Sequence, residues 1–423
     1  MIGKLTTLLM AAGFAAQAGM AVAAGSDVSA NLKLQTFGSD AQLGAVKHAV
    51  ERFNKAYPNV KVEIAIDPIS NGWGDYVTKV LSQFNANNAY DVYGTAIETY
   101  QSFEARNLFV PLDDYIAKNP SYADFDANLF KYSSYKGKTY FVPIGWNNIM
   151  INYNRALFKA AGVDYPKAGW TWDDLRAAAK KLTVRDAAGN VTQYGYEVPN
   201  QNFFVQPWFL SNGTSPINAD WTASNMLDPK VAETLQFLHD LIHVDKVSPI
   251  PGKDSMDNQF MAGQVAMISR GRWIVHNVQA AKVDMDVAIP PAKLNDYTVL
   301  GFGGYAISKT TKYPELAQAL VGELTSGETQ KEEAALGGSV PGRKSAAETP
   351  EFLAFPPSSQ LYYQTLPHTK PVPSPANFQE VEKIFIRNYI AMMSDEISIP
   401  DGVKRADQEL NESFKRLAAQ QGK

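Results

Sequence analysis

LKLQTFGSDAQLGAVKHAVERFNKAYPNVKVEIAI, residues 32–66, is the stretch of this sequence that decides the fold. Apolar and polar residues alternate over 32–37 and again over 60–66, which predicts two half-buried strands. Between them runs the apolar stripe of an amphipathic helix, at Leu43, Val46, Val50, Phe53 and Tyr57. A strand, a helix and a second strand of these lengths predict a βαβ unit with parallel strands.

The same alternation of strands and helices continues along the chain. A helical pattern over 75–84 is followed by a short strand at 91–93, and two further strands are predicted at 140–144 and 149–153. Gly145-Trp146-Asn147-Asn148 lies between the last two strands and fits a crossing from one lobe to another. About 400 residues suffice for two domains with separate cores. We therefore expect an α/β protein of two lobes.

The amino-terminal residues 1–24 indicate export. Lys4 precedes an apolar run that ends in Ala21-Val22-Ala23-Ala24, a pattern typical of a cleavable signal peptide. The chain has no cysteine, which excludes disulfides, thiolate metal sites and a lipidated amino-terminal cysteine. These features predict a protein that is released into the periplasm.

Composition narrows the class of partner. The net charge is −4, which argues against nucleic acid, because its binding requires a basic surface. The chain is rich in aromatic residues, with 7 Trp, 20 Tyr and 21 Phe. Trp and Tyr side chains in loops supply flat apolar surfaces that suit the C–H faces of sugars.

Two predicted helices further along the chain carry polar residues that resemble those of catalytic or metal-binding sites. Thr171 caps a helix over 171–182, so Asp173 and Asp174 belong to a helix start. A second helix opens at Pro229, and its His239 and His243 have the spacing of some zinc ligands. No third ligand is evident nearby, and we interpret the pair as histidines at a helix carboxyl end. The proline-rich 356–375 is expected to form a surface connection.

Short motifs occur in a fixed order along nearly the whole mature chain. The motifs are AVERFN (49–54), VKVE (60–63), VPLDD (110–114), YKGKTYFVP (135–143), YNRALF (153–158), AGV (161–163), WTWDDL (170–175), FMAGQVAM (260–267), GRW (271–273), GGY (303–305) and LTS (324–326). In that order the sequence resembles the large extracellular solute-binding proteins of carbohydrate ABC importers, the group that contains maltose-binding protein.

The resemblance implies the two-lobed periplasmic-binding-protein fold of type II, with a mostly parallel sheet flanked by helices in each lobe. It implies that the chain crosses between lobes near 145–148, 290–295 and 326–330. The expected segments are a signal peptide over 1–24, an amino-terminal lobe over 25–145 with 296–326, and a carboxy-terminal lobe over 146–295 with 327–423.

Candidate ligand-binding residues follow the predicted strands, because ligands of open α/β sheets bind beyond the carboxyl ends of the strands. Trp73 and Trp208 fit either the cleft or a core. From the strand ends, the candidates are Ser39, Asp40, Asn71, Trp73, Thr95, Glu98, Asn147 and Asn148. An expected loop of the second lobe adds Gln206 and Trp208.

The resemblance adds further candidates. It implies Trp273 as a stacking platform, and Tyr305 as a contact reached across Gly303 and Gly304. Arg343 matches a position that reaches ligand in some members, and is otherwise a surface charge. Glu98 matches an aspartate of maltose-binding protein that bonds sugar hydroxyls.

Asn147 stands where maltose-binding protein has a glutamate, which argues against a maltose-type ligand. The expected function is capture of a carbohydrate in the cleft, without turnover, cofactor or metal, by a monomer that delivers it to the permease subunits of an importer in the inner membrane. The alternatives are a binder of a charged solute such as glycerol-3-phosphate, a polyamine or iron, and a secreted glycoside hydrolase, whose paired carboxylates need not be neighbours in sequence.

Overall fold

The computed structural model describes residues 28–38, 40–67, 69, 73–252 and 256–422. The predicted signal peptide over 1–24 lies outside the described residues. Within the described part of the chain, no helix combines the length and the apolar character needed to cross a membrane.

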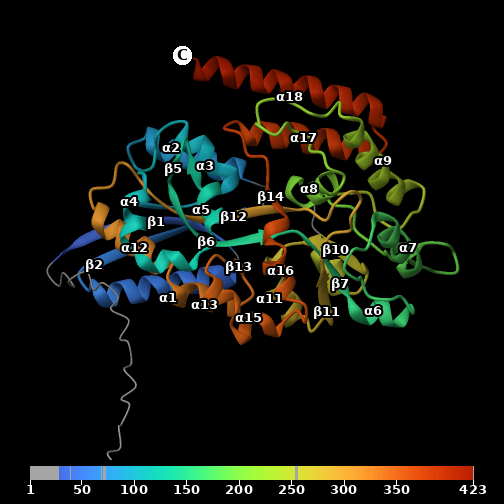
Figure 1. Cartoon of the computed structure of the whole chain (residues 1–423), viewed down its shortest axis with the longest axis horizontal. Coiled ribbons are helices and arrows are strands. Elements are labelled where there is room, and N and C mark those ends of the chain that lie inside the picture. The colour runs from blue at the N-terminus through green and yellow to red at the C-terminus, as the bar shows by residue number, and fades with distance from the viewer. Residues whose placement is uncertain (1–27, 39, 68, 70–72, 253–255, 423) are drawn as a thin grey trace, which may run out of the picture.

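Two lobes lie side by side, each with its own sheet and hydrophobic core (Figure 1). The first lobe holds a seven-stranded mixed sheet in the order β13-β6-β12-β3-β1-β2, with β14 paired to β12. Its strands are β1 (Ala30–Phe37), β2 (Val60–Asp67), β3 (Val92–Ala96), β6 (Phe141–Asn148), β12 (Thr298–Ile307), β13 (Val340–Pro341) and β14 (Thr369–Pro371).

The βαβ unit predicted from residues 32–66 is confirmed. β1 runs parallel to β2, with Leu32 opposite Val62, and α1 (Asp40–Ala56) connects the two strands. β3 then pairs in parallel with the other edge of β1, after α2 (Gly74–Asn85). The carboxyl ends of these strands therefore meet at one edge of the sheet.

The second lobe holds a three-stranded sheet in the order β10-β7-β11, formed by β10 (Met267–Arg270), β7 (Met150–Asn154) and β11 (Met285–Ala288). Both pairings are antiparallel, so the prediction of a mostly parallel sheet in each lobe was wrong here. It was also wrong for the first lobe, where parallel and antiparallel pairings are equally frequent among the described strands. All three strands of the second lobe are buried along their length and lack the alternation of an open antiparallel sheet. Burial on both faces is also typical of parallel strands, so the character of these strands could not separate the two arrangements.

Helices cover both sheets. Those packed with the first sheet are α1, α2, α3 (Ile97–Glu104), α4 (Asp113–Lys118), α5 (Ala127–Tyr132), α12 (Pro314–Leu324), α13 (Gly327–Ala335), α14 (Lys344–Ala347), α15 (Pro350–Ala354) and α16 (Gln360–Gln364). The second lobe contains α6 (Arg155–Ala160), α7 (Trp172–Leu182), α8 (Asn202–Ser211), α9 (Pro229–His243), α10 (Asp257–Met261), α11 (Val275–Ala280), α17 (Phe378–Met393) and α18 (Ile399–Gln421). Short hairpins β4 (Ser134–Tyr135) with β5 (Lys138–Thr139) and β8 (Val184–Arg185) with β9 (Val191–Gln193), and 3-10 turns at Pro120–Asp124, Arg272–Ile274 and Leu366–His368, complete the chain.

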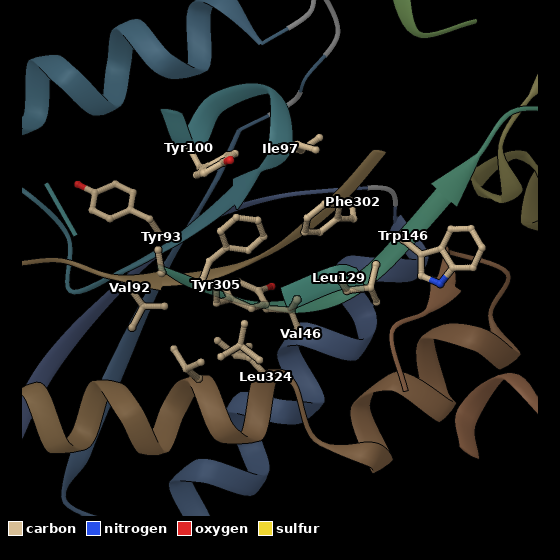
Figure 2. Packing of buried hydrophobic residues seen from close by; sticks show 14 of the residues in the cluster. Val46, Val92, Tyr93, Ile97, Tyr100, Leu129, Trp146, Phe302, Tyr305 and Leu324 are labelled. Carbon is tan, nitrogen blue, oxygen red and sulfur yellow. The ribbon is translucent and has the colours of Figure 1, made fainter. Parts of the chain in front are cut away.

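The core of the first lobe occupies both faces of its sheet. Figure 2 shows Ile97 and Tyr100 of α3 on one side and Val46 of α1 with Leu324 of α12 on the other. Trp146 of β6 is 1% exposed and donates its indole Nε1–H to the carbonyl of Pro341. β6 is thereby held in this lobe up to the point where the chain leaves it.

Two crossings between lobes lie where they were expected. The chain passes from β6 to β7 at Ile149, and from β11 to β12 over residues 289–297. The third does not lie at 326–330. α13 packs on α1, β13 pairs with β6, and β14 pairs with β12, so residues 327–371 lie in the first lobe.

The chain crosses a third time over 372–377, before α17. The proline-rich 356–375 is likewise not a surface connection, because Tyr362 of α16 is fully buried in the first core. Pro367 lies in the first turn of the short helix Leu366–His368, and Pro371 lies at the end of β14. Buried contacts with distant strands decide this placement, and local sequence does not display them.

Two predicted helices are confirmed. Thr171 caps α7 with a capping box, in which its hydroxyl accepts from the backbone N–H of Asp174 and the Asp174 carboxylate accepts from the backbone N–H of Thr171. The hydrogen bond that the Thr171 hydroxyl donates to the Asp174 carboxylate, together with that from the Thr171 backbone N–H, lowers the pKa of Asp174. α9 begins at Pro229, with its predicted stripe of Val231, Leu235, Leu238 and Ile242 buried.

Candidate ligand-binding cleft

A cleft of about 1280 Å³ lies between the two lobes. The first lobe supplies Thr36 and Phe37 at the end of β1, Trp73 before α2, Glu98 in α3, and the glycine-rich middle of β12. The second lobe supplies Asn202, Phe203, Arg270, Trp273 and Glu382 among others. Because both lobes line one space, a ligand in it would contact both.

An aromatic cluster forms the first-lobe wall. The rings of Phe37 and Trp73 meet edge to face with centroids 4.7 Å apart, and Tyr76 packs against both. Tyr76 is buried, whereas Trp73 and Phe37 are half-buried and line the cleft. Such edge-to-face packing fixes the orientation of the exposed ring. The result is a rigid apolar surface on this side.

A second aromatic cluster forms the opposite lobe's wall. Trp273 stacks on Phe204 at 5.7 Å with an interplanar angle of 24°, and Phe203 lies 6.3 Å from it. A Cβ at Gly271 would lie 2.0 Å from the indole ring, so only glycine lets Trp273 fold back over the backbone. The half-buried indole keeps part of its surface in the cleft.

Arg270 supports this second platform. Its guanidinium is fully buried, pairs with Glu197 at 2.9 Å and Asp257 at 2.7 Å, and lies 4.6 Å from the centroid of Phe204. Burial raises the pKa of Glu197, and the nearby arginine opposes that rise. The carboxylates of Glu197 and Asp257 therefore balance the charge of Arg270. The ring of Phe204 lies between the Arg270 guanidinium and the Trp273 indole.

Two half-buried carboxyl groups reach the cleft from different lobes. Burial raises the pKa of Glu98 in the first turn of α3 to about 8, and the charge of Glu382 on α17 adds to the rise. Burial raises the pKa of Glu382 itself to about 7. Among the described residues, neither carboxyl has a side-chain hydrogen-bond or ion-pair partner. Both can accept from or donate to a polar ligand.

Asn147 and Arg272 connect the lobes beside the first crossing. The backbone N–H of Arg272 donates to the Oδ1 of Asn147 at 2.9 Å. The Arg272 guanidinium lies 4.3 Å from the ring centroid of Phe352 in the first core, and burial lowers its pKa to about 10. Asn147 borders the cleft, but its carbonyl oxygen is already engaged in this link.

The structure brings seven of the fifteen sequence candidates to the cleft. Those that line it are Trp73, Glu98, Asn147, Trp273, Gly303, Gly304 and Tyr305. Ser39 and Asn71 lie outside the described residues, and Asp40 is described only as the start of α1. Thr95, Asn148, Gln206, Trp208 and Arg343 do not line the cleft.

Gly304 and Tyr305 contribute to the packing of the first lobe, independently of any ligand. A Cβ at Gly304 would lie 2.0 Å from the carbonyl oxygen of Val142, so the glycine permits the close pairing of β12 with β6. Tyr305 is 3% exposed, and its hydroxyl lies 3.2 Å from the Thr36 hydroxyl. Its ring belongs to the core, and only a small part reaches the cleft.

Trp208 lies in the core of the second lobe, on α8 and not in the loop that was expected. It is 3% exposed, packs its ring 5.4 Å from Trp172, and donates its Nε1–H to Tyr196 at 3.1 Å. Gln206 on the same helix is buried, and its amide donates to Asn202 at 2.7 Å. The mainly apolar segment 202–211 gave no helical period, because most of its side chains are buried.

Arg343 is neither a surface charge nor a cleft residue. It is 4% exposed, its guanidinium donates to the carbonyls of Thr325 and Ser121, and it lies 4.5 Å from the ring centroid of Phe125. Thr95 and Asn148 are also fully buried: the Thr95 hydroxyl lies 2.9 Å from that of Thr99, and Asn148 donates to the carbonyl of Tyr362. Each of the three side chains bonds to partners inside the first lobe, although the Oδ1 of Asn148 has no hydrogen-bond partner among the described residues.

Several cleft residues were missed by reading the sequence. Phe37 is the last residue of a predicted strand, and Arg270 directly precedes the GRW motif, so position could have indicated both. Phe203, Asn202 and Glu382 lie on helices whose sequence shows no sign of a ligand. Only the approach of α8 and α17 to the first lobe places them.

Known structures share this architecture. An ABC substrate-binding protein of Listeria monocytogenes, solved with cycloalternan, superposes with a TM-score of 0.83 at 23% identity, over 92% of this chain and 100% of that one. A solute-binding protein of Thermotoga lettingae, solved with α-D-tagatose, gives 0.80 at 22% identity, over 91% and 100%. The Thermus thermophilus maltotriose-binding protein gives 0.75 at 20% identity, over 90% and 100%.

Sequence comparison agrees with the fold. A binding protein of Brucella abortus (strain 2308) is 24% identical over 256 residues, which are 58% of this chain. The chain spans 59% of the length of that relative. Residues 48–356 match the family of bacterial extracellular solute-binding proteins. With two lobes, three crossings and an aromatic cleft between them, the chain belongs to the bacterial extracellular solute-binding proteins.

Proposed function

We propose that this protein captures a neutral carbohydrate, a mono- or oligosaccharide or a sugar alcohol, in the cleft between its lobes. The observation that carries the proposal is the pair of half-buried tryptophans, Trp73 and Trp273, which line one cleft from different lobes. Covering about 80 Å² of a pyranose face stabilises a complex by about 2 kcal/mol. Two such platforms suit a ring that is apolar on its faces and polar at its edge.

The polar groups of the cleft support a neutral ligand. Glu98, Glu382 and Asn202 supply carboxyl and amide groups that bond hydroxyls. The buried arginine of the cleft, Arg270, is already paired with two carboxylates, and Arg343 lies elsewhere. A phosphate-bearing solute would use several cationic donors, and beside the paired Arg270 the described lining of the cleft offers only Lys383, an exposed side chain on α17.

The proposal also covers where the protein acts and how the bound carbohydrate reaches the membrane. The protein acts in the periplasm after removal of residues 1–24, as a monomer, and presents its ligand to the permease subunits of an ABC importer in the inner membrane. Binding occurs without chemical change of the ligand. Support comes from membership of an extracellular family and from the sugars in the solved relatives.

A thermal-unfolding screen tests the proposal. A ligand that binds only the folded state raises the melting temperature by mass action. At a ligand concentration of a hundred times its Kd, the free energy of unfolding increases by about 2.7 kcal/mol. We expect at least one neutral sugar or polyol to do so, and to be recovered unaltered after prolonged incubation. Stabilisation by glycerol-3-phosphate or spermidine alone, or recovery of hydrolysed sugar, would refute it.

The same screen identifies a ligand for a test of closure. Because cleft groups belong to both lobes, a bound ligand that touches both sets favours a closed form. Small-angle scattering should then show a smaller radius of gyration at saturation. An unchanged radius would mean that the cleft is preformed.

The cleft carboxyls predict a pH dependence for the ligand-free protein. The pKa of Glu98 is raised in the folded state, to about 8, so the folded protein holds a proton that the unfolded chain releases near pH 4 to 5. Stability contributed by that proton is complete below the unfolded pKa and is lost as the pH rises towards 8. Glu98→Gln keeps a neutral side chain and should raise stability at pH 8 by on the order of 1–2 kcal/mol, with little change at pH 5.

Thermal unfolding between pH 5 and 8 measures this difference. Glu51→Gln, an exposed position on α1, is the control and should leave the pH profile of the wild type unchanged. Parallel profiles of Glu98→Gln and the wild type would show that Glu98 ionises freely in the cleft.

A further inference from the structure

Two histidines and a carboxylate meet on the second lobe, away from the cleft. His239 and His243 lie in the last turns of α9, and Asp395 lies in the turn between α17 and α18. The Nε2 of His239 is 2.7 Å from the Oδ1 of Asp395, and the Nδ1 of His243 is 3.2 Å from its Oδ2. The fold thus supplies the third group that the sequence did not display.

The protonation of His243 is decided by its second contact. Its Nε2 lies 2.8 Å from the carbonyl oxygen of Met393, which only accepts, so the Nε2 carries a proton. In the neutral ring the Nδ1 is then a bare lone pair that faces a carboxylate oxygen. Two acceptors at 3.2 Å repel each other, so a cation belongs between them, either a proton or a metal ion.

The two imidazoles and the carboxylate face one another closely enough to share one ion. The two imidazole rings lie 4.3 Å apart at 31°, and each presents one nitrogen to the Asp395 carboxylate. A divalent ion at that point takes the place of the protons between these nitrogens and the carboxylate, and its charge attracts the carboxylate.

The arrangement around His243 is that of a metal ligand. Histidines that bind metals almost always donate their other ring N–H to a carbonyl or carboxylate, which fixes the tautomer and aims the free nitrogen. Met393 provides that carbonyl. Asp395 has a φ of 60°, a conformation that glycine or asparagine usually occupies at a helix end. A carboxylate is held there, directed at two imidazoles.

We propose that His239, His243 and Asp395 bind a divalent transition-metal ion of the zinc type. Two imidazole nitrogens and one carboxylate oxygen are a ligand set for Zn²⁺, with the remaining position open to water. The candidate ligand atoms lie within 4.8 Å of one another, and the ligands of one tetrahedral zinc ion lie about 3.4 Å apart. The side chains therefore have to draw together when the ion binds.

The affinity should be moderate. When the ion takes the Nε2 of His239, the remaining proton moves to its Nδ1, which is buried and has no hydrogen-bond partner among the described residues. An unpaired buried donor opposes binding. We therefore expect a dissociation constant in the micromolar range. The site would clamp α9 to the turn between α17 and α18.

Calorimetric titration of zinc into untagged, chelator-treated mature protein tests the proposal. We expect one ion per chain, and a loss of affinity of about tenfold or more in both His243→Gln and Asp395→Asn. Asparagine tolerates the left-handed backbone, so Asp395→Asn keeps the turn. Circular dichroism checks that both variants are folded.

Matched controls come from two surface histidines that each pair with a single carboxylate, His48 with Glu332 and His368 with Asp296. His48→Gln and His368→Gln should bind zinc as the wild type does. No binding by the wild type, or equal binding by Asp395→Asn, overturns the site. None of the three ligands lines the cleft, so sugar binding by these variants reports on the proposed function separately.

Discussion

Replacing Trp273 with alanine is expected to weaken ligand binding by about 2 kcal/mol, roughly thirtyfold, with a modest loss of folding stability. The indole is half-buried, rests on Phe204, and keeps a face in the cleft. Removing it removes the apolar surface that would cover a sugar ring. Because part of the ring is already exposed, the folded state loses less than it would from a core residue.

Trp208→Ala is the matched comparison. Trp208 is 3% exposed and bonded to Tyr196, so its loss should cost about 3–5 kcal/mol of folding stability. The protein that remains folded should bind with nearly unchanged affinity. Calorimetric titration with the sugar found by the screen, beside chemical denaturation, separates the two effects. Unchanged affinity in Trp273→Ala would assign that ring to the core.

Arg270→Met is expected to cost about 3–5 kcal/mol of folding stability, because it leaves the carboxylate of Glu197 buried without its cation. Arg270 is fully buried and Glu197 is 3% exposed, so water cannot replace the lost partner. Affinity should also fall, since the guanidinium over Phe204 holds the ring on which Trp273 rests.

The double variant Arg270→Met with Glu197→Leu should recover much of that stability, because an apolar pair carries no buried charge. Chemical denaturation of the single and double variants measures this coupling. Arg155→Met is the control: it breaks a half-exposed pair with Asp284 at 3.1 Å, and should cost less than about 1 kcal/mol. An Arg270→Met loss as small as the control's would show that the buried pair is not a stabilising unit.

Contacts between distant segments explain where the sequence-based prediction of the site was incomplete. Trp73 and Glu98 follow strands whose carboxyl ends meet at one sheet edge, so local order placed them in the cleft. Trp208 and Arg343 have sequence neighbourhoods no different from those of cleft residues. Their burial results from partners far along the chain, Tyr196 and Phe125 among them.

Periodicity and capping were enough for the sequence to determine the local elements of this protein. The strands and helix of the βαβ unit at 30–67, the capped helix α7 and the stripe of α9 each follow from patterns within a few residues, although the pairing of β1 with β2 joins residues such as Ala30 and Val60. Tertiary structure alone decided the antiparallel sheet of the second lobe, the third crossing at 372–377, and the approach of Glu382 to the cleft and Asp395 to two histidines. Each of these features depends on contacts between segments far apart in sequence. The free energy gained by burying apolar surface in those contacts outweighs the local preference of a segment for helix, strand or loop.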